Sequence, residues 1–420
     1  MMKVLVVGGG GREHAIIWKL SQSPGISVLY CAPGNGGIGR MATCVGIEAT
    51  DIRSMVQFSK DNAIDLVVVT PDDPLAIGMV DALEEAGIRA FGPRKDAAII
   101  ESSKVFAKGL MKKYDIPTGD YKVFSDYNEA LTYLKETNYP QVIKADGLAL
   151  GKGVIITKNF AEAGKALEEI MVDKIFGTAG NQVIIEEFLV GQEVSLLAFS
   201  DGHTIVPMVS AQDHKRAFDG DKGPNTGGMG AFSPSRVYTP EIANIVETEI
   251  LEPTIQAMNK EGRPFKGVLF LGLILTQDGP KLLEYNARFG DPETQVVLPR
   301  LKTDLLDIFL AVADERLDEI DIEWEDSAVA CVVLTSGGYP GSYKKGYPIR
   351  GLENLDGSHD TIAFHAGTRW QEDRFLTDGG RVLGVTAVAE DLDRAVKNAY
   401  KGVDLISFKD MHYRRDIGLK

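Results

Sequence analysis

The stretch 282-LLEYNARFGDPETQ-295 decides the fold expected for this chain of 420 residues. Read with a period of two, it has an apolar and a polar face: Leu283, Tyr285, Ala287 and Phe289 on the first, and Glu284, Asn286 and Arg288 on the second. Such alternation predicts a half-buried strand. The polar face therefore offers two oxygen ligands and a guanidinium in a row.

These polar side chains suggest a metal and anion site. Glu284 and Asn286 supply hard oxygen donors, the ligand type that Mg²⁺ takes when it also binds nucleotide phosphates. Their Cα atoms would lie about 6.6 Å apart, so both side chains can lean towards one metal ion. Arg288 can pair with a carboxylate or stabilise an oxyanion. The alternative is an edge strand with a polar outer face.

The composition bounds the class of protein. A charged fraction of 25% and a hydrophobic fraction of 44% are typical of a soluble globular protein of several domains. The net charge of −15 argues against a nucleic-acid partner, and no apolar run approaches the length of a membrane span. The three cysteines show no metal-ligand spacing and are typical of reduced thiols, so we expect a cytoplasmic protein.

Strand and helix patterns divide the chain. The first hundred residues alternate strands with helices, including one helix from about Leu75 to Gly87, which predicts a parallel sheet. Mixed strands and helices follow, with a glycine-rich loop at 219–230 and a long helix at 239–260. Several strands and one helix (390–405) make up the C-terminal residues, with a hairpin at 379-GGRV-382.

The loop 8-GGGGREH-14 lies between a predicted strand and helix, where backbone N–H groups favour an anion. It is not a dinucleotide-binding fingerprint, because Glu13 or His14 stands at the third glycine position. A phosphate site and a simple glycine turn both remain open.

The loop 147-GLALGKG-153 resembles a nucleotide P-loop but departs from it. Only three residues separate Gly147 from Gly151, and Gly153 follows Lys152 where Ser or Thr is needed. We instead expect a flexible glycine-rich hairpin that supplies N–H donors to phosphates. Lys144, in the apolar strand before it, predicts a buried anionic partner, with exposure of its ammonium as the alternative.

Two further segments carry polar groups. In 183-VIIEEFLVGQEVSL-196 the adjacent acids Glu186 and Glu187 point to opposite faces of a strand. The run 211-AQDHKRAFDGDKGPNTGGMGAF-232 has few groups able to build a core. Long polar loops of this kind are usually functional or disordered.

Taken in order, these motifs resemble the ATP-grasp ligases. GGGGREH, APGN (32–35), IKADGLALGKGV, GPNTGGMG and EYNARFGDPETQ are similar to the glycinamide ribonucleotide synthetase branch, and the resemblance covers almost the whole chain. GPNTGGMG and RFGDPETQ are the most specific matches. One departure is 70-TPDDPL-75, where the branch has Gly-Pro-Glu before the helix, so any substrate contact made by that motif is in doubt.

The resemblance implies an ATP-dependent ligase of purine biosynthesis that joins glycine to 5-phosphoribosylamine through a glycyl phosphate. It implies an α/β and α+β multidomain fold: a Rossmann-like N-terminal pre-ATP-grasp domain (1–102), a two-part ATP-grasp domain (103–326) with a small lid (about 120–190), and a small β-rich C-terminal domain (327–420). The expected partners are ATP, glycine, phosphoribosylamine and Mg²⁺ or Mn²⁺, for a monomer that binds neither nucleic acid nor membrane.

The resemblance also implies residue roles. Arg288 is the expected oxyanion stabiliser, and Glu284 and Asn286 the metal ligands. The ATP-binding residues would be Lys104, Lys144, Gly151, Lys152, Gly153, Glu186, Glu187, Leu189 and Glu193. The residues around the other substrates would be Gly9, Gly10, Gly11, Asn35, Asp213, Lys215 and Asp291.

Two rival functions remain. Another ATP-grasp ligase would share the ATP and metal sites and differ in the 211–232 loop and the first domain. A non-catalytic nucleotide-binding protein would be expected to lack Arg288 or a metal ligand, and this chain has all three. The glycine spacing excludes a NAD-dependent oxidoreductase.

Overall fold

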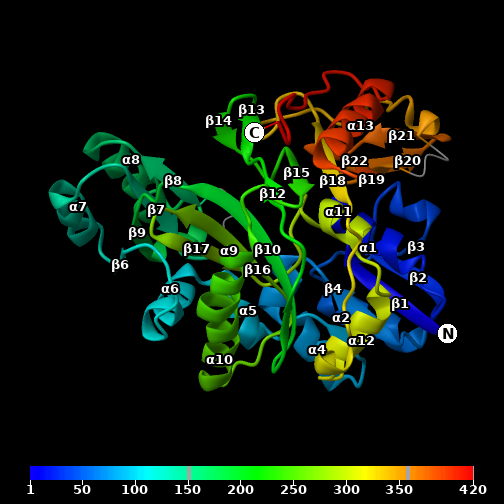
Figure 1. Ribbon diagram of the computed structural model, residues 1–420, viewed down its shortest axis with the longest axis horizontal. Coiled ribbons are helices and arrows are strands. Elements are labelled where there is room, and N and C mark those ends of the chain that lie inside the picture. The colour runs from blue at the N-terminus through cyan, green and yellow to red at the C-terminus, as the bar shows by residue number, and fades with distance from the viewer. Residues whose placement is uncertain (149–152, 356–359, 420) are drawn as a thin grey trace.

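A computed structural model describes residues 1–148, 153–355 and 360–419. Four parts can be followed in Figure 1: an N-terminal part (β1–β5, α1–α5), a small part (β6–β9, α7, α8), a central part around a second sheet, and a C-terminal part (β18–β22, α13). Among the described residues, none of the helices has the length and apolar character needed to cross a membrane.

The N-terminal part is a parallel sheet in the strand order β3-β2-β1-β4-β5, as the alternation of strands and helices predicted. Its strands are β1 (Met2–Gly8), β2 (Ile26–Pro33), β3 (Thr43–Cys44), β4 (Leu66–Val69) and β5 (Ala90–Phe91). Its helices are α1 (Gly11–Leu20), a 3-10 turn (Ile38–Arg40), α2 (Ile52–Asp61), α3 (Asp72–Ile77), α4 (Met79–Glu85) and α5 (Lys95–Ser102).

The helix predicted from about Leu75 to Gly87 is two helices. α3 begins three residues earlier, at Asp72, and ends at Ile77, and α4 begins at Met79, so that Gly78 separates them. Gly78 has a φ of +93°, a left-handed conformation that glycine adopts without strain and that ends a helix. The apolar periodicity continued through this break and concealed it.

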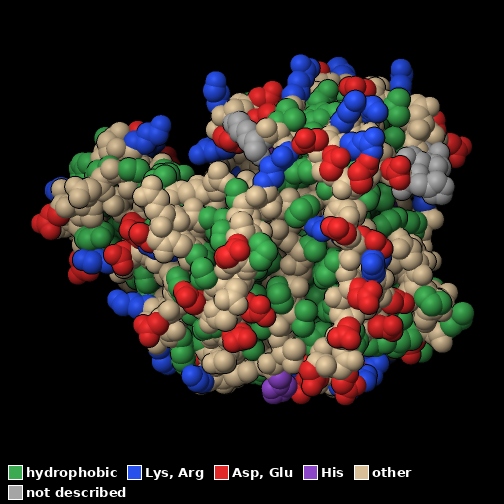
Figure 2. Space-filling model, in the orientation of Figure 1, with side chains coloured by type: hydrophobic (Ala, Val, Ile, Leu, Met, Phe, Trp, Pro, Cys, Tyr) green, Lys and Arg blue, Asp and Glu red, His purple; other side chains and the backbone are tan. Residues whose placement is uncertain are grey.

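The small part is an antiparallel sheet in the order β6-β9-β7-β8, covered by two helices. It comprises β6 (Tyr121–Phe124), α7 (Tyr127–Glu136), β7 (Gln141–Ala145), β8 (Val154–Thr157), α8 (Phe160–Met171), a 3-10 turn (Gly177–Asn181) and β9 (Val183–Glu187). These elements have a hydrophobic core of their own. The small part therefore projects from the rest of the molecule, at the left of Figures 1 and 2.

The central part is an antiparallel sheet in the order β11-β10-β16-β17. Its strands are β10 (Gln192–Asp201), β11 (Ile205–Pro207), β16 (Lys266–Thr276) and β17 (Gly279–Asn286). Its helices are α6 (Lys104–Lys113), α9 (Pro240–Val246), a π-helical turn (Glu247–Leu251), α10 (Glu252–Lys260), α11 (Thr294–Val297), a 3-10 turn (Leu298–Arg300), α12 (Leu305–Ala313) and a 3-10 turn (Leu317–Glu319).

The segment 211–232, expected as a long loop, contains four short strands: β12 (Gln212–Asp213), β13 (Arg216–Phe218), β14 (Lys222–Asn225) and β15 (Gly230–Ser233). β13 and β14 form a hairpin, while β12 and β15 join the C-terminal sheet in the order β12-β15-β18-β22-β19. This sheet therefore extends across the domain boundary predicted after residue 326.

The remaining elements of the C-terminal part are β18 (Ala328–Thr335), a 3-10 turn (Leu352–Asn354), β19 (Thr361–His365), β20 (Thr368–Gln371), β21 (Arg374–Thr377), β22 (Arg381–Ala389) and α13 (Leu392–Leu405). The N-terminal and central parts share two hydrophobic cores, one on each face of the N-terminal sheet. Because these cores include residues of both parts, the N-terminal and central parts pack together, with the small part beside them (Figure 1).

Candidate active site

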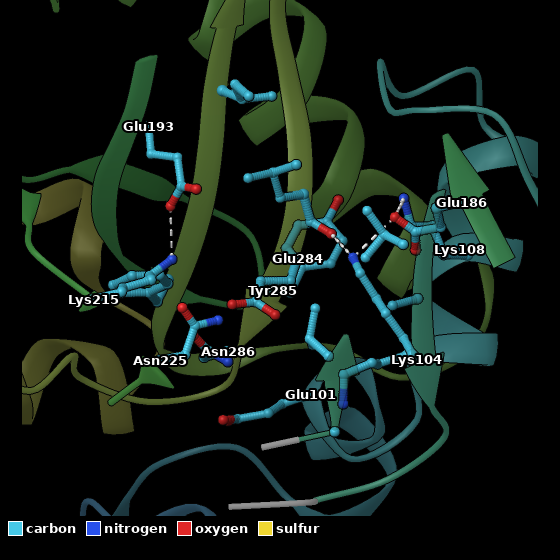
Figure 3. A pocket seen from close by; sticks show the side chains of 18 of the residues that line it. Glu101, Lys104, Lys108, Glu186, Glu193, Lys215, Asn225, Glu284, Tyr285 and Asn286 are labelled. Atoms are coloured by element: carbon cyan, nitrogen blue, oxygen red, sulfur yellow. Dashed lines mark hydrogen bonds and ion pairs between the residues drawn. The ribbon is translucent and has the colours of Figure 1, made fainter. Parts of the chain in front are cut away.

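A cavity of about 320 Å³ lies where the small, central and N-terminal parts meet. Residues of α6, β7, β8, β9 and β17 line it, together with the segment that follows β14. In the close view, Lys215 and Glu193 lie on one side of the end of β17, and Lys108 and Glu186 on the other (Figure 3). Thirteen of the 19 site residues predicted from the sequence line this cavity, while Gly9, Gly10, Gly11 and Asn35 do not.

The polar face of β17 lines this cavity, but one residue assigned to the apolar face of the strand does not lie where the pattern predicted. Leu282 is buried in the core, whereas Leu283 lines the cavity beside Glu284. The register with β16 shifts between Gly272 and Leu273. Gly272 pairs with Glu284 and Leu273 with Leu282, so Leu283 is the extra residue of a β-bulge. The assignment of Leu283 to the buried face was therefore wrong, while the polar residues Glu284, Asn286 and Arg288 do line the cavity.

Glu284 and Asn286 have the chemistry of a hard-cation site. Neither side chain makes a hydrogen bond or ion pair with another residue in the described part of the chain. Although burial opposes ionisation, Lys215 and Lys144 lead a group of cations that lowers the pKa of Glu284. No three acidic, His or Cys side chains within the described ranges form a metal-binding group, so a metal ion here would need ligands from a substrate or water.

Arg288 is fixed beside the cavity by a buried carboxylate. Its Nη2 lies 3.0 Å from Glu101 Oε1, and Glu101 Oε2 accepts a hydrogen bond of 2.7 Å from the backbone N–H of Ala287. Burial raises the pKa of Glu101, although the charge of Arg288 opposes this shift. Arg288 Nε is buried and has no acceptor among the described residues, so one donor of the guanidinium is available.

Lys104 and Lys144 approach the cavity from α6 and β7. Lys104 Nζ donates to Gly147 O at 2.8 Å, and burial lowers the pKa of Lys104 although Glu284 opposes this shift. Lys144 Nζ lies 2.9 Å from Glu186 Oε2 and donates to Leu283 O at 3.2 Å. Lys144 is thus the buried, paired lysine that its apolar strand predicted.

The glycine-rich hairpin is only partly described. Gly153 lines the cavity just before β8, and Gly147, two residues after the end of β7, has a φ of +136°. The predicted phosphate-binding residues Gly151 and Lys152 lie outside the described residues.

The residues after β9 differ in their surroundings. Glu186 is buried, whereas Glu187 is partly exposed and accepts a hydrogen bond of 3.0 Å from the backbone N–H of Asp120. Leu189 lines the cavity. Glu193 Oε2 lies 3.0 Å from Lys215 Nζ in a pair that is about half exposed, so water or a ligand can reach it.

Asp213 and Lys215 bring charge from β12 and the turn that follows it. Burial raises the pKa of Asp213 to about 7, and Lys215 opposes this shift. Conversely, Asp213 and Glu193 hold the pKa of Lys215 well above its usual value in spite of burial.

The N-terminal glycine loop binds one of the protein's own carboxylates. Glu13 Oε2 accepts a hydrogen bond of 2.6 Å from Gly10 N, and Glu13 Oε1 lies 2.6 Å from Arg12 Nε and 2.8 Å from Thr70 Oγ1. The N–H of Gly10 is thus already engaged. Those of Gly9 and Gly11 have no acceptor within the described part of the chain.

Asn35 links this loop to the C-terminal part. Its Nδ2 donates to Gly9 O at 2.9 Å and to His365 O at 2.8 Å, while its Oδ1 accepts from Gly37 N and Ile38 N. All polar atoms of the side chain therefore have protein partners. The predicted contact of Asn35 with a substrate phosphate stays a prediction, and its observed role is to order the loop.

Asp291 lines the cavity next to the same loop and pairs with a residue that the sequence did not single out. Arg381 Nη2 lies 3.1 Å from Asp291 Oδ2, and Arg381 Nη1 donates to Asp291 O at 2.7 Å and to Gly227 O. Arg381 thereby connects the C-terminal part to both substrate-side segments. It lies in the 379-GGRV-382 motif, but the prediction of a hairpin there was wrong, because β21 pairs with β20 while β22 pairs with β18 and β19.

Lys108 is the other residue that the sequence interpretation missed. It is 3% exposed, and its Nζ lies 3.1 Å from Glu186 Oε2. The signal was present, because Lys108 occupies the apolar face of α6 with Ala107, Leu110 and Met111.

Family models match most of the chain. The models of phosphoribosylglycinamide synthetase match in its N domain at residues 2–101, its ATP-grasp (A) domain at 102–294 and its C domain at 329–420. These three matches lie in the same order as the N-terminal, central and C-terminal parts of the structure. The domain boundaries at residues 102 and 326 themselves remain predictions.

Relatives and a solved structure agree with the family models. Proteins named phosphoribosylamine–glycine ligase are 50% identical in Caldanaerobacter subterraneus subsp. tengcongensis, over 99% of each chain, and 51% identical in Halalkalibacterium halodurans, over 100% of this chain and 97% of the relative. A crystal structure of phosphoribosylamine–glycine ligase from Thermotoga maritima superposes with a TM-score of 0.87 at 32% identity, over 99% of this chain and 100% of the other. The chain belongs to the phosphoribosylglycinamide synthetase family.

Proposed function

We propose that the protein is an ATP-dependent ligase that joins glycine to 5-phosphoribosylamine, giving glycinamide ribonucleotide, ADP and phosphate. The observation that carries this proposal is the single cavity lined by Glu284, Asn286 and Arg288 together with Lys104 and Lys144. The full-length similarity to proteins named phosphoribosylamine–glycine ligase supports this choice of substrates and the place of the reaction in purine biosynthesis.

The reaction needs an activated carboxylate. Glycine's carboxylate oxygen would attack the γ-phosphorus of ATP, so that the bond to ADP breaks and glycyl phosphate forms. The amine of phosphoribosylamine would then attack the carbonyl carbon. The tetrahedral intermediate expels phosphate, and the nitrogen loses one proton as the amide forms.

Arg288 is the proposed oxyanion stabiliser for that second step. Its Nε is buried without an acceptor in the described part of the chain, and its other nitrogens are fixed by Glu101 and Phe289 O. A fixed donor stabilises developing negative charge without first having to reorient. A small part that excludes water would protect the acyl phosphate from hydrolysis.

ATP would lie between the small and central parts. Lys104, Lys144 and the hairpin 151–153 would hold its phosphates, and Glu193 its ribose. Glu186, Glu187 and Leu189 would contact adenine. The cavity has apolar walls suited to a base here, formed by Ala107, Met111, Val142, Ile156, Phe188 and Leu283.

Glu284 and Asn286 would hold Mg²⁺ or Mn²⁺. The two side chains offer oxygen donors that no described residue engages, and the lowered pKa of Glu284 keeps its carboxylate ionised. When bound, the ion would neutralise charge on the phosphates of ATP.

The other substrates would lie nearer the N-terminal loop. The phosphate of phosphoribosylamine would meet Gly9, Gly10 and Gly11 near Asn35, with the free N–H groups of Gly9 and Gly11 as the available donors. Asp213, Lys215 and Asp291 would lie around glycine and the ribose.

We further propose that residues 120–190 act as a lid on the ATP-grasp domain and that the protein is a monomer of the cytoplasm. The separate core of the small part supports the first proposal. Three cysteines without a disulfide support the last. No nucleic-acid or membrane partner is proposed.

The test is ADP release by the purified protein with Mg²⁺-ATP, glycine and freshly made phosphoribosylamine, omitting each substrate in turn. ADP should form only when both co-substrates are present. Arg288→Ala should lose about 10²- to 10³-fold in turnover. Arg316→Ala, a change at an exposed arginine, should match the wild type.

Two results would contradict the proposal. If omitting phosphoribosylamine did not change ADP release while another amine increased it, the assignment of phosphoribosylamine as the substrate would be wrong. The proposed ATP site would still hold. Full activity of Arg288→Ala would remove the role of Arg288.

A further inference from the structure

The adenine end of the cavity contains a buried cluster of three charges that the proposed function does not fully use. Glu186 Oε2 lies 2.9 Å from Lys144 Nζ and 3.1 Å from Lys108 Nζ. All three side chains are at most 7% exposed. Figure 3 shows Glu186 and Lys108 together at one side of the cavity.

The two lysines leave one carboxylate oxygen free. Glu186 Oε1 is buried and has no hydrogen-bond partner among the described residues, although Glu186 lines the cavity. An unsatisfied buried acceptor is costly and requires a donor when the site is filled. A ligand in the cavity that Glu186 lines can supply this donor.

Lys144 is not a dedicated partner for Glu186. Its ammonium also donates to Leu283 O, and in the proposed function it holds ATP phosphates. Lys108, in contrast, is fixed from behind: its Nζ donates to Thr118 Oγ1 at 2.7 Å, and Thr118 in turn donates to Leu282 O at 2.6 Å. Lys108 can thus hold Glu186 while Lys144 turns to the nucleotide.

We propose that Lys108 is a positioning residue for base selection. It holds the Glu186 carboxylate in the orientation in which Oε1 accepts a hydrogen bond from the exocyclic amino group of adenine. The site thereby prefers a 6-aminopurine nucleotide over one that lacks this group. The inference rests on the proposed function only in taking a purine nucleoside triphosphate as the ligand.

Because only the protonated ammonium of Lys108 can hold the Glu186 carboxylate, the preference for adenine should depend on pH. Burial lowers the pKa of Lys108 to about 8, against the raising effect of Glu186. The other charged or titratable groups that face it are Lys144 on β7, Glu284 on β17 and the ring of Tyr121 on β6, 5.7 Å away. Burial raises the pKa of Tyr121, so this phenol stays neutral where Lys108 titrates.

The test is calorimetric binding of ATP and of purine riboside triphosphate, which has hydrogen in place of the amino group, to the full chain without co-substrates. The wild type should prefer ATP about tenfold or more, as expected for a hydrogen bond to a charged acceptor. Lys108→Met should reduce this preference to about twofold or less. Lys112→Met, one turn along on the exposed face of α6, should keep the wild-type ratio.

The ratio separates positioning from a merely structural role. Equal weakening of both nucleotides by Lys108→Met, or an unchanged preference, would overturn the inference. If Lys108→Met does not fold, Lys108→Arg should retain a preference above twofold, and the wild-type preference should decline between pH 7 and 9.5. The inference would also be overturned if Lys108→Arg showed no preference for ATP and the wild-type preference did not change between pH 7 and 9.5.

The outcome is distinct from that of the proposed function. A Lys108-dependent preference without ADP release in the ligase assay would leave the inference standing and remove the proposed reaction. A wild-type protein that binds neither nucleotide would overturn both.

Discussion

The nucleotide end of the site lies in the cavity, and the glycine-loop end, with Glu13 and Asn35, lies outside its lining; the two use their polar side chains in opposite ways. At the nucleotide end, Glu186 Oε1 and the side chains of Glu284 and Asn286 lack hydrogen-bond partners within the described part of the chain. At the glycine-loop end, the polar atoms of Asn35 and Glu13 are all engaged by the protein.

We therefore expect the nucleotide end to recognise its ligand through side chains and the glycine-loop end to recognise its ligand through backbone N–H groups. A side chain without a protein partner is available to a ligand, so its loss should appear in binding or turnover. A side chain that is bonded to its own loop fixes the backbone, so its loss should appear first in stability. The first prediction concerns the other oxygen of Glu186, Oε2, which two lysines engage, and each later prediction tests one side of this comparison.

The largest expected effect is on stability at the nucleotide end. Glu186→Ala would leave Lys108 and Lys144 buried without their counter-charge, and removing one partner of a buried ion pair costs about 3–5 kcal/mol. Urea unfolding of the wild type and of Glu186→Ala without ligands measures this loss of unfolding free energy. Glu193→Ala, which breaks the half-exposed pair with Lys215, should change stability by about 1 kcal/mol or less. Equal losses would remove the distinction between the two pairs.

Glu284→Gln should affect turnover much more than stability. The change keeps the size of the side chain and removes the charge of a proposed metal ligand, so ADP release should fall about a hundredfold or more. Unfolding free energy should stay within about 1 kcal/mol, because no described residue bonds to the carboxylate. The matched control is Glu252→Gln, at an exposed acid of α10 that does not line the cavity, and it should leave both turnover and stability unchanged. A large loss of unfolding free energy in Glu284→Gln would show that Glu284 stabilises the fold and would contradict this prediction.

At the glycine-loop end, stability should depend on pH through His14. His14 Nδ1 accepts a hydrogen bond of 2.6 Å from His365 N, and burial lowers the pKa of His14 to about 4. The unfolded chain takes up the proton near pH 6.5, so this contribution is complete above pH 6.5 and is lost as pH falls towards 4.

For His14 alone the loss should be about 2 kcal/mol between pH 7 and pH 5. Unfolding measured across this range in wild type and His14→Gln should show a shallower slope in the variant. His203→Gln, a change at an exposed histidine, should retain the wild-type slope. Parallel curves for all three proteins would exclude His14 as the cause.

The smallest effect is expected at Thr70. Its hydroxyl lies 2.8 Å from both Val7 O and Glu13 Oε1, so Thr70→Val should cost about 1 kcal/mol of stability. The affinity for phosphoribosylamine should change less than threefold, because the hydroxyl is turned to the protein. A tenfold loss of affinity would place Thr70 among the substrate contacts.

Local sequence patterns predicted the features that depend on short-range geometry. The period-two alternation was sufficient to group Glu284, Asn286 and Arg288, and an apolar strand was sufficient to predict that Lys144 is paired. The bulge at Leu283 could not be predicted, because it depends on the register with β16. The polar, glycine-rich composition of 211–232 also concealed that β12 and β15 join the C-terminal sheet.

Long-range contacts account for the residues that were missed. Lys108 meets Glu186 only through the packing of α6 on the small sheet, and Arg381 meets Asp291 across 90 residues of chain. No local period encodes such pairs. The predicted roles of Gly9, Gly11 and Asp213 as substrate contacts stay predictions.

The arrangement of aromatic residues has an optical consequence. The chain has three tryptophans, Trp18, Trp324 and Trp370, and none lies within 120–190. Trp18 stacks edge-on with Phe364, so intrinsic tryptophan emission would report how the C-terminal part docks on the N-terminal part. A tryptophan in place of Tyr133, whose ring lies 5.2 Å from that of Phe124, would give the small part the only indole within that range. Its spectrum could then follow nucleotide-linked motion separately from the rest of the molecule.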